Sequence, residues 1–359
     1  MPKQIKKVLK KLWSIFKRYY HNGWWHKFVV YFLIAISIST IFMYSVAEWY
    51  IHSNPNVPTT FGVSFIPDYA ESLGLNPQQT MKALISIGVK QFRLTSYWTD
   101  LAPTINTYDF SSLDWQFSLA EKANAKITLT LGLRQPRWPE CHMPNWATNE
   151  PTAAWEKQLY SFITAVVNRY KNSPSLQYYQ LENEYFLKGF GDCTNFSRSR
   201  LVYEYNLVKR LDPSHPIIIG RSNNDLGIPL GAPKPDIYSV SVYRKVWDAA
   251  FTHRYLAYPF ESWYYAFLAG IQKILLNRDM VIDEMQAEAW TPNGLTIPQT
   301  SLAEQNRSMN AQDLLSNFNF ARNTGMKSVD MWGAEYWYYR LTILHDPSLW
   351  NVAKQEFKK

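Results

Sequence analysis

The stretch QYYQLENE (177–184) is a short run of strand-forming residues that ends in polar and acidic side chains. Similar short runs recur before and after it, and longer stretches with the amphipathic spacing of helices separate most of them. Strands that alternate with helices form βα units, and such strands pair in parallel. Eight strands are predicted, at 61–66, 91–95, 126–132, 177–184, 216–221, 237–243, 280–285 and 328–333. Eight consecutive βα units predict a closed (β/α)8 barrel, also called a TIM barrel.

Helices are predicted in the connections between these strands. Asn76-Pro77 and Glu150-Pro151 place proline near a helix start, where its missing N–H costs nothing. The connection between the fifth and sixth strands has no clear helix, so one unit is expected to be irregular. The predicted helices are 77–88, 111–124, 152–171, 198–211, 260–277 and 303–324.

Polar and aromatic side chains collect just after the predicted strands. In a (β/α)8 barrel the carboxyl ends of the strands meet at one face, and that face carries the chemistry. These positions therefore predict one site at the mouth of the barrel. The candidates are Arg93, Trp98, Trp138, His142, Asn183, Glu184, Tyr243, Glu284, Trp290, Trp332, Glu335 and Trp337.

Two glutamates end the fourth and seventh predicted strands, and we predict that they are the catalytic pair. Hydrolysis of a glycosidic bond with retention needs a carboxylic acid and a carboxylate about 5 to 5.5 Å apart. Glu184 is predicted to be the general acid/base and Glu284 the nucleophile. Asn183 is placed to hydrogen-bond the sugar 2-OH, while Tyr243 and Arg93 are placed to keep Glu284 ionised. These neighbours should push the pKa values of the two glutamates apart.

Two further acidic residues lie beside this pair. Strand alternation puts Glu182 on the same side as Glu184 but one layer deeper, where it is expected to be a structural partner for Arg93 or Arg134. Asp283 has the opposite parity to the neighbouring nucleophile and is expected to pair behind the barrel. Both are therefore predicted to be structural.

Other residues near the mouth have two possible roles each. Glu288 is expected to contact substrate, with the role of nucleophile as its alternative. Glu335 is a sugar-hydroxyl acceptor or a loop salt bridge, and His142 is a substrate or a structural hydrogen-bonding group. Sugar rings stack on indoles, and Trp332 is the predicted floor of the reactive subsite. Ordinary packing is the alternative for Trp138, Trp290 and Trp337.

Four fragments together resemble the clan A glycoside hydrolases. They are FRLTSYW (92–98), QLENEYF (180–186), VIDEMQAEAW (281–290) and MWGAEYWYY (331–339). The second fragment is closest to the β-galactosidase families of that clan. The resemblance implies a (β/α)8 barrel and a retaining glycosidase with Glu184 as acid/base and Glu284 as nucleophile. Two departures are Tyr185, where the clan often has proline, and a sixth strand that lacks the histidine often found before its tyrosine.

The N-terminal part is predicted to be a membrane anchor. Residues 28–47 contain no charged side chain, and twenty residues of helix span about 30 Å of hydrocarbon. Residues 1–27 carry the lysines of a basic amphipathic segment, which should stay cytoplasmic and contact anionic lipid or serve only to set the topology. The barrel, 61–359, would then lie outside the cell membrane after a linker at 48–60. A cleaved signal peptide is the alternative, because Ser45-Val46-Ala47 resembles a cleavage site.

The charge balance argues against nucleic-acid binding. The net charge is +8, from 37 basic and 29 acidic residues, and eight of the basic residues lie in 1–27. The remaining 29 basic residues equal the acidic ones, whereas nucleic-acid binding needs a basic face. The expected partners are a carbohydrate substrate and, through residues 1–47, membrane lipid.

Cys141 and Cys193 both fall in the predicted outer part, where disulfides persist, and they are expected to pair rather than remain free thiols. No Cys/His zinc spacing, glycine-rich phosphate loop or serine elbow is present, so no metal or cofactor is expected. The predicted function is a retaining glycoside hydrolase that cleaves β-glycosidic bonds through a glycosyl-enzyme intermediate. A non-catalytic glycan-binding or scaffold barrel and a transglycosylase are the alternatives.

Overall fold

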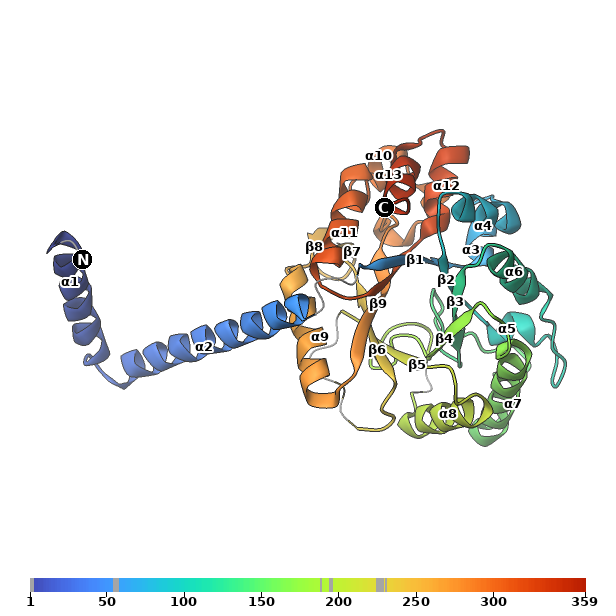
Figure 1. The fold of residues 1–359 in the computed structure, drawn as a ribbon, viewed down its shortest axis with the longest axis horizontal. Coiled ribbons are helices and arrows are strands. Elements are labelled where there is room, and N and C mark those ends of the chain that lie inside the picture. Colours follow the sequence, from blue (N-terminus) through green and yellow to red (C-terminus); the bar gives the residue numbers. More distant parts are fainter. Residues whose placement is uncertain (1–2, 54–57, 188, 194–195, 224–228, 230) are drawn as a thin grey trace.

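The computed structural model describes residues 3–53, 58–187, 189–193, 196–223, 229 and 231–359. Its centre is a closed barrel of eight parallel strands in the order β1-β10-β9-β6-β5-β4-β3-β2 (Figure 1). The predicted TIM barrel is confirmed, and each predicted strand is present with small shifts at its ends. The strands are β1 Thr60–Phe65, β2 Gln91–Leu94, β3 Lys126–Leu131, β4 Leu176–Leu181, β5 Ile217–Arg221, β6 Ile237–Val242, β9 Asp279–Gln286 and β10 Ser328–Trp332.

Helices surround the barrel and bury the outward faces of the strands (Figure 1). Most follow the predicted ranges, and the described residues between β5 and β6 form no helix, as expected. The predicted helix 303–324 is two helices, because Ser301 caps the first and Asn310 caps the second by accepting N–H groups of their opening turns. The helices are α3 Pro67–Ser72, α4 Pro77–Ser86, α5 Trp98–Leu101, α6 Ser111–Lys122, α7 Thr152–Tyr170, α8 Arg198–Leu211, α9 Ser262–Leu276, α10 Leu302–Gln305, α11 Ala311–Asn323, α12 Ala334–Thr342 and α13 Ser348–Glu356.

The loops at the carboxyl ends of the strands carry small elements of their own. An antiparallel hairpin, β7 Lys245–Asp248 and β8 Arg254–Ala257, follows β6. Two 3-10 turns, η1 Pro292–Gly294 and η2 Ile297–Gln299, follow β9. These insertions build one side of the barrel mouth.

Two helices precede the barrel, α1 Lys3–Tyr20 and α2 Trp24–His52. Of the described residues, α2 is the one helix long and apolar enough to cross a membrane. It projects from the barrel as a rod with α1 at its far end (Figure 1). Its C-terminal turns pack on α9, and a Cβ added to Gly270 of α9 would lie 2.8 Å from Val46 Cγ1. The helix continues past Ala47 to His52, into the predicted linker, of which 54–57 lie outside the described residues.

Candidate active site

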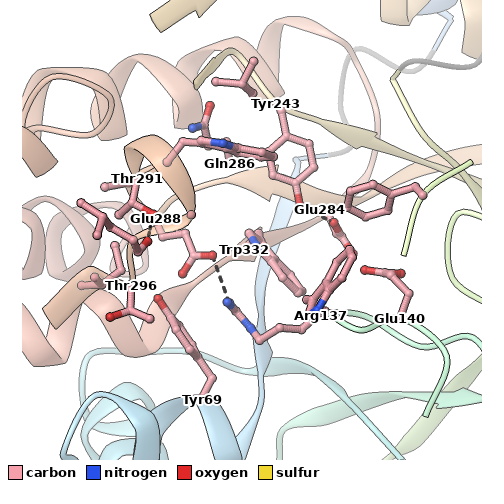
Figure 2. Close-up of a pocket in the computed structure, with 18 of the residues that line it drawn as sticks. Tyr69, Arg137, Glu140, Tyr243, Glu284, Gln286, Glu288, Thr291, Thr296 and Trp332 are labelled. Carbon is pink, nitrogen blue, oxygen red and sulfur yellow. Dashed lines mark hydrogen bonds and ion pairs between the residues drawn. The ribbon is translucent and has the colours of Figure 1, made fainter. Parts of the chain in front are cut away.

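A cavity of about 600 Å³ opens at the carboxyl ends of the strands. Six of the predicted site residues line it, namely Trp138, Glu184, Tyr243, Glu284, Trp290 and Trp332. Tyr69, Arg137, Glu140 and Glu288 also line it, as Figure 2 shows for several of these side chains. Four carboxyl groups and one guanidinium therefore face one pocket. No group of three or more His, Cys, Asp or Glu that could hold a metal ion occurs among the described residues.

Glu284 on β9 is held at both carboxylate oxygens. Arg93 of β2 donates from Nη1 to Oε1 at 2.8 Å, and Tyr243 donates from Oη to Oε2 at 2.6 Å. Both predicted contacts are thus present in this buried setting. Two hydrogen-bond donors, one of them charged, therefore fix the orientation of the Glu284 carboxylate.

Glu184 reaches the pocket from a turn rather than from a strand. β4 ends at Leu181, and Glu182 and Glu184 adopt left-handed φ values of 54° and 39°. The predicted end of the fourth strand at 184 is therefore wrong by three residues, because the chain bends sharply where alternation was expected to continue.

The surroundings of Glu184 favour a neutral carboxyl group. Burial raises the pKa of Glu184 well above its usual value, and the nearby Glu284 and Glu140 raise it further. Its Oε1 is buried without a hydrogen-bond partner among the described residues. Glu184 and Glu284 thus line one pocket, but the donors that hold Glu284 have no counterpart at Glu184 Oε1 among the described residues.

A β-bulge turns two successive residues of β9 into the barrel. Ile282 pairs with Val240 and Glu284 pairs with Ser241, which leaves Asp283 as an extra residue. Asp283 was expected to pair behind the barrel, but its Oδ2 accepts hydrogen bonds inside the barrel from Ser239 at 2.6 Å and Gln180 at 3.2 Å. That expectation is wrong because the bulge breaks the alternation on which it was based.

Asp283 is buried directly beneath the candidate nucleophile. Its Oδ2 lies 3.9 Å from Arg93 Nη2. Burial raises the pKa of Asp283 to about 6, with Arg93 lowering it and Glu284 raising it. Gly220 leaves room for it, since a Cβ there would lie 2.7 Å from Asp283 Oδ2.

Glu182 has the predicted structural role but a different position. Its carboxylate accepts the backbone N–H groups of Leu133 and Arg134, each at 2.9 Å, and lies 3.8 Å from Arg200 Nη2. It therefore contacts the loop after β3 rather than the barrel interior or the Arg93 guanidinium. The bend after β4 takes it away from the side on which Glu184 lies.

Asn183 links Arg93 to Glu140 by hydrogen bonds to both side chains. Its Oδ1 accepts a hydrogen bond from Arg93 at 2.7 Å, and its Nδ2 donates to Glu140 Oε2 at 3.0 Å. Asn183 does not line the cavity in this structure, although it was predicted to contact the sugar. Its amide instead fixes Glu140 relative to Arg93.

Glu140 is the main site residue that the sequence did not single out. Burial raises the pKa of Glu140 to about 7, Asn183 opposes this, and Glu284 adds to it. Its loop is joined to the loop after β4 by the disulfide Cys141–Cys193, which confirms the predicted pairing. Its position beside Cys141, after the third strand, was the available signal.

Arg137 covers Trp332, the predicted floor of the reactive subsite. Its guanidinium carbon lies 4.6 Å from the Trp332 ring centroid and 3.4 Å from that of Tyr69. Its Nη2 pairs with Glu288 Oε1 at 3.0 Å, the ion pair that Figure 2 shows. Trp332 thus lines the cavity, but Arg137 occupies one face of its ring. Glu288 therefore pairs with Arg137 rather than with Arg93 and Tyr243, the residues that hold Glu284.

Two predicted tryptophans do not reach the cavity. Trp98 is fully buried and packs on Trp146 and Phe162 of the wall, with ring centroids 5.4 and 6.3 Å away. Trp337 is fully buried in α12 and donates from Nε1 to the Ala287 carbonyl oxygen at 2.7 Å. Their predicted role in binding substrate is therefore corrected to a packing role.

Two predicted polar contacts also have structural partners. His142 stacks on Tyr97 at 3.6 Å, its Nε2 lies 3.2 Å from the Arg137 carbonyl oxygen, and burial lowers the pKa of His142 to about 4. Glu335 accepts the Ile66 N–H at 2.6 Å, and burial raises the pKa of Glu335 to about 7. Neither lines the cavity, so of the two roles considered for each residue the contacts favour the structural one.

Solved structures show where this fold occurs elsewhere. A β-galactosidase from the Antarctic haloarchaeon Halorubrum lacusprofundi aligns with a TM-score of 0.54 at 14% identity, over 84% of this chain and 58% of that one. A GH5_18 protein from Streptomyces cattleya, solved in complex with GlcNAc, aligns with a TM-score of 0.57 at 10% identity, over 84% of this chain and 80% of that one. A GH5_18 variant from Bifidobacterium longum, in complex with Manb1-4GlcNAc, aligns with a TM-score of 0.57 at 11% identity, over 84% and 78% of the two chains.

The sequence itself gives no comparable match. No protein-family model matches it, and the comparison with curated proteins found no match. The chain spans less than two thirds of the haloarchaeal β-galactosidase. At these identities the likeness concerns the fold, and this chain has the (β/α)8-barrel fold of those glycoside hydrolases.

Proposed function

We propose that this chain is a retaining glycoside hydrolase that acts on β-glycosides, with Glu184 as general acid/base and Glu284 as nucleophile. One observation carries the proposal: a carboxyl group with a raised pKa and a carboxylate held by Arg93 and Tyr243 line the same pocket. Two carboxyl groups in opposite protonation states are what this chemistry requires. Their place at the carboxyl ends of barrel strands agrees with it.

In the first step Glu184 gives its proton to the glycosidic oxygen while a Glu284 oxygen attacks the anomeric carbon. The bond between that carbon and the leaving oxygen breaks, the aglycone leaves as an alcohol, and a glycosyl ester of Glu284 forms. Arg93 and Tyr243 orient the attacking carboxylate before the reaction.

In the second step Glu184, now a carboxylate, takes a proton from water. The water oxygen attacks the anomeric carbon, the ester bond breaks, and Glu284 leaves as a carboxylate. Glu184 ends protonated, and the sugar is released with its original anomeric configuration.

Substitution of the two glutamates tests the proposal. Glu284→Gln and Glu184→Gln should each reduce turnover of aryl β-glycosides by several orders of magnitude, while thermal denaturation shows an intact fold. Azide should restore turnover to Glu184→Ala on substrates with good leaving groups, because that variant can still form the ester. Turnover that stays at the wild-type level in both glutamine variants would contradict the assignment.

The same turnover assay also distinguishes the two alternative functions from a glycoside hydrolase. A non-catalytic glycan-binding barrel predicts sugar binding without turnover in the wild-type chain. A transglycosylase predicts that a sugar acceptor replaces water in the second step, so longer glycosides would accumulate at high substrate concentration. Product analysis by mass spectrometry distinguishes these outcomes.

We also propose that α2 anchors the chain in a cytoplasmic membrane, with residues 1–27 inside and the barrel outside. The charge-free run 28–47 and the lysines before it support this topology. Burial of Val46 and Ala47 against α9 favours a retained anchor, because cleavage after Ala47 would remove both from the packed surface. We expect the chain in purified membranes to keep its Lys-rich N-terminus, which N-terminal sequencing would check.

A further inference from the structure

Part of α2 belongs to the proposed membrane-spanning run and also packs on the barrel. Phe42 and Tyr44 of α2 contact Phe267 and Trp263 of α9, with ring centroids 6.5 and 6.3 Å apart. Two turns of α9 therefore lie beside residues that belong to the charge-free run 28–47. The start of α9 lies beside residues 40–45, near the end of this run, so it is at the outer edge of the hydrocarbon core when residues 28–47 span it.

The start of α9 is also the end of the barrel that carries the pocket. α9 runs antiparallel to the strands, because it begins after the loop that follows β6 and ends just before β9 starts. Thr40 and Ile41 of α2 border a shallow groove with Trp263, the second residue of α9. The C-terminal end of α2 lies at the opposite end of the barrel from the pocket, where Ile51 lies against Gly325 in the turn before β10. The anchor thus leaves the barrel wall on the side of the mouth.

The β7–β8 hairpin precedes α9 in the same loop and exposes a large apolar side chain. Phe251, at the tip between the two strands, is 89% exposed, so it does little for the packing of the barrel. Leu256 and Arg254 on β8 are exposed as well. Aromatic side chains with basic neighbours are typical of segments at the membrane–water interface.

We propose that the hairpin tip is a second membrane contact, in which Phe251 inserts among the lipid headgroups beside α2. The inference rests on the proposed anchoring and is independent of the glycosidase chemistry. Two contacts would keep the mouth end of the barrel close to the bilayer, within reach of glycans that are attached to the membrane or lie at its surface.

The chain is well suited to a test by site-specific labelling. Among the described residues there is no free cysteine, since Cys141 and Cys193 are paired. Phe251→Cys can therefore carry one environment-sensitive fluorophore in the full-length chain, reconstituted into vesicles that contain phosphatidylglycerol. Ile105→Cys is the matched control: Ile105 is exposed too, but lies between α5 and α6, on the side of the barrel away from α2 (Figure 1).

We expect the label at position 251 to shift its emission to shorter wavelength in vesicles. Lipids with a quencher near the headgroup should quench it at least threefold more than the label at 105. Equal emission and equal quenching at the two positions would overturn the inference.

Extraction of the same vesicles at alkaline pH keeps the two membrane proposals distinguishable. A chain that stays in the membrane while position 251 remains unquenched overturns the hairpin contact alone. A chain that washes off overturns the anchor, and with it the second contact. Turnover is not measured in either arm, so a failure of the glycosidase assignment does not affect the result.

Discussion

At the scale of single residues, the site is a set of donors and acids arranged around one carboxylate. Arg93 contacts Glu284, Asn183 and Gln180 through different nitrogen atoms of its guanidinium. Because all of these groups are buried, each is costly to leave without a partner. The geometry of Glu284 therefore depends on residues that do not line the cavity.

Tyr243→Phe tests the hydroxyl that holds the nucleophile. The variant removes the 2.6 Å hydrogen bond to Glu284 Oε2, and hydrogen bonds to charged groups contribute about 1.5–3 kcal/mol. We expect kcat on aryl glycosides to fall by about 10- to 100-fold. A variant that keeps the wild-type kcat would show that Tyr243 does not support the nucleophile.

Glu140→Gln tests a positioning residue. The Glu140 charge raises the pKa of Glu184, so its removal should lower that pKa. Activity needs protonated Glu184, and hence the alkaline limb of the kcat/KM profile should move to lower pH. A purely structural role of Glu140 would lower activity without moving this limb, and the pH profile separates the two.

At the scale of elements, the strands could be predicted and the ends of the strands could not. Apolar β-branched runs such as 216–221 are long enough to identify a buried strand without tertiary information. The turn that carries Glu184 and the bulge at Asp283 depend on backbone choices that the pattern of side chains does not encode. The catalytic candidates were found by their place after strands, whereas the neighbours Arg137 and Glu140 required the folded loop.

Predictions for the aromatic residues failed for a related reason. Trp98 and Trp337 follow strands as expected, but each begins or lies within a helix that turns its ring into the wall. Trp138, which stays in an irregular loop, remains at the rim and is 61% exposed. The helices that begin after these strands therefore decided the orientation of Trp98 and Trp337, and the sequence pattern did not reveal it.

Gly220→Ala tests the room that β5 leaves for the bulge. The new methyl group would lie 2.7 Å from Asp283 Oδ2 and 2.8 Å from Ser239 Oγ, so their hydrogen bond must rearrange. Overpacking of this kind costs about 1–3 kcal/mol of unfolding free energy, measurable by denaturant titration. Gly189→Ala is the control, since no atom of the described residues lies within 4 Å of its added Cβ. Equal stability of both variants would contradict the packing described.

At the scale of the whole molecule, the C-terminal turns of α2 pack on α9 and so form part of the outer wall of the barrel. Val46, Ala47 and Tyr50 are buried on the outer side of α9. The N-terminal segment and the barrel are therefore not independent units joined by a tether, although the composition of 48–60 predicted a plain linker.

A pair of fragments tests this dependence. A fragment that begins at Ser53 loses the cover that Val46 and Tyr50 give to α9, whereas one that begins at Met43 keeps it. Exposure of the apolar area involved should lower the free energy of unfolding by about 3–6 kcal/mol in the shorter fragment, and promote its self-association. Thermal denaturation and size-exclusion chromatography would measure both, and fragments of equal stability would show that the contact contributes nothing.

The packing of α2 on α9 limits how far the barrel can move to reach a substrate. A catalytic domain on a disordered linker samples a volume that grows with the length of the linker. A domain that packs on a stiff helix, as the barrel does on α2 through α9, stays at a nearly constant distance from the far end of that helix. In the membrane topology proposed above, its substrates would have to arrive by lateral diffusion, and lengthening residues 53–60, after the end of α2, would not extend its reach.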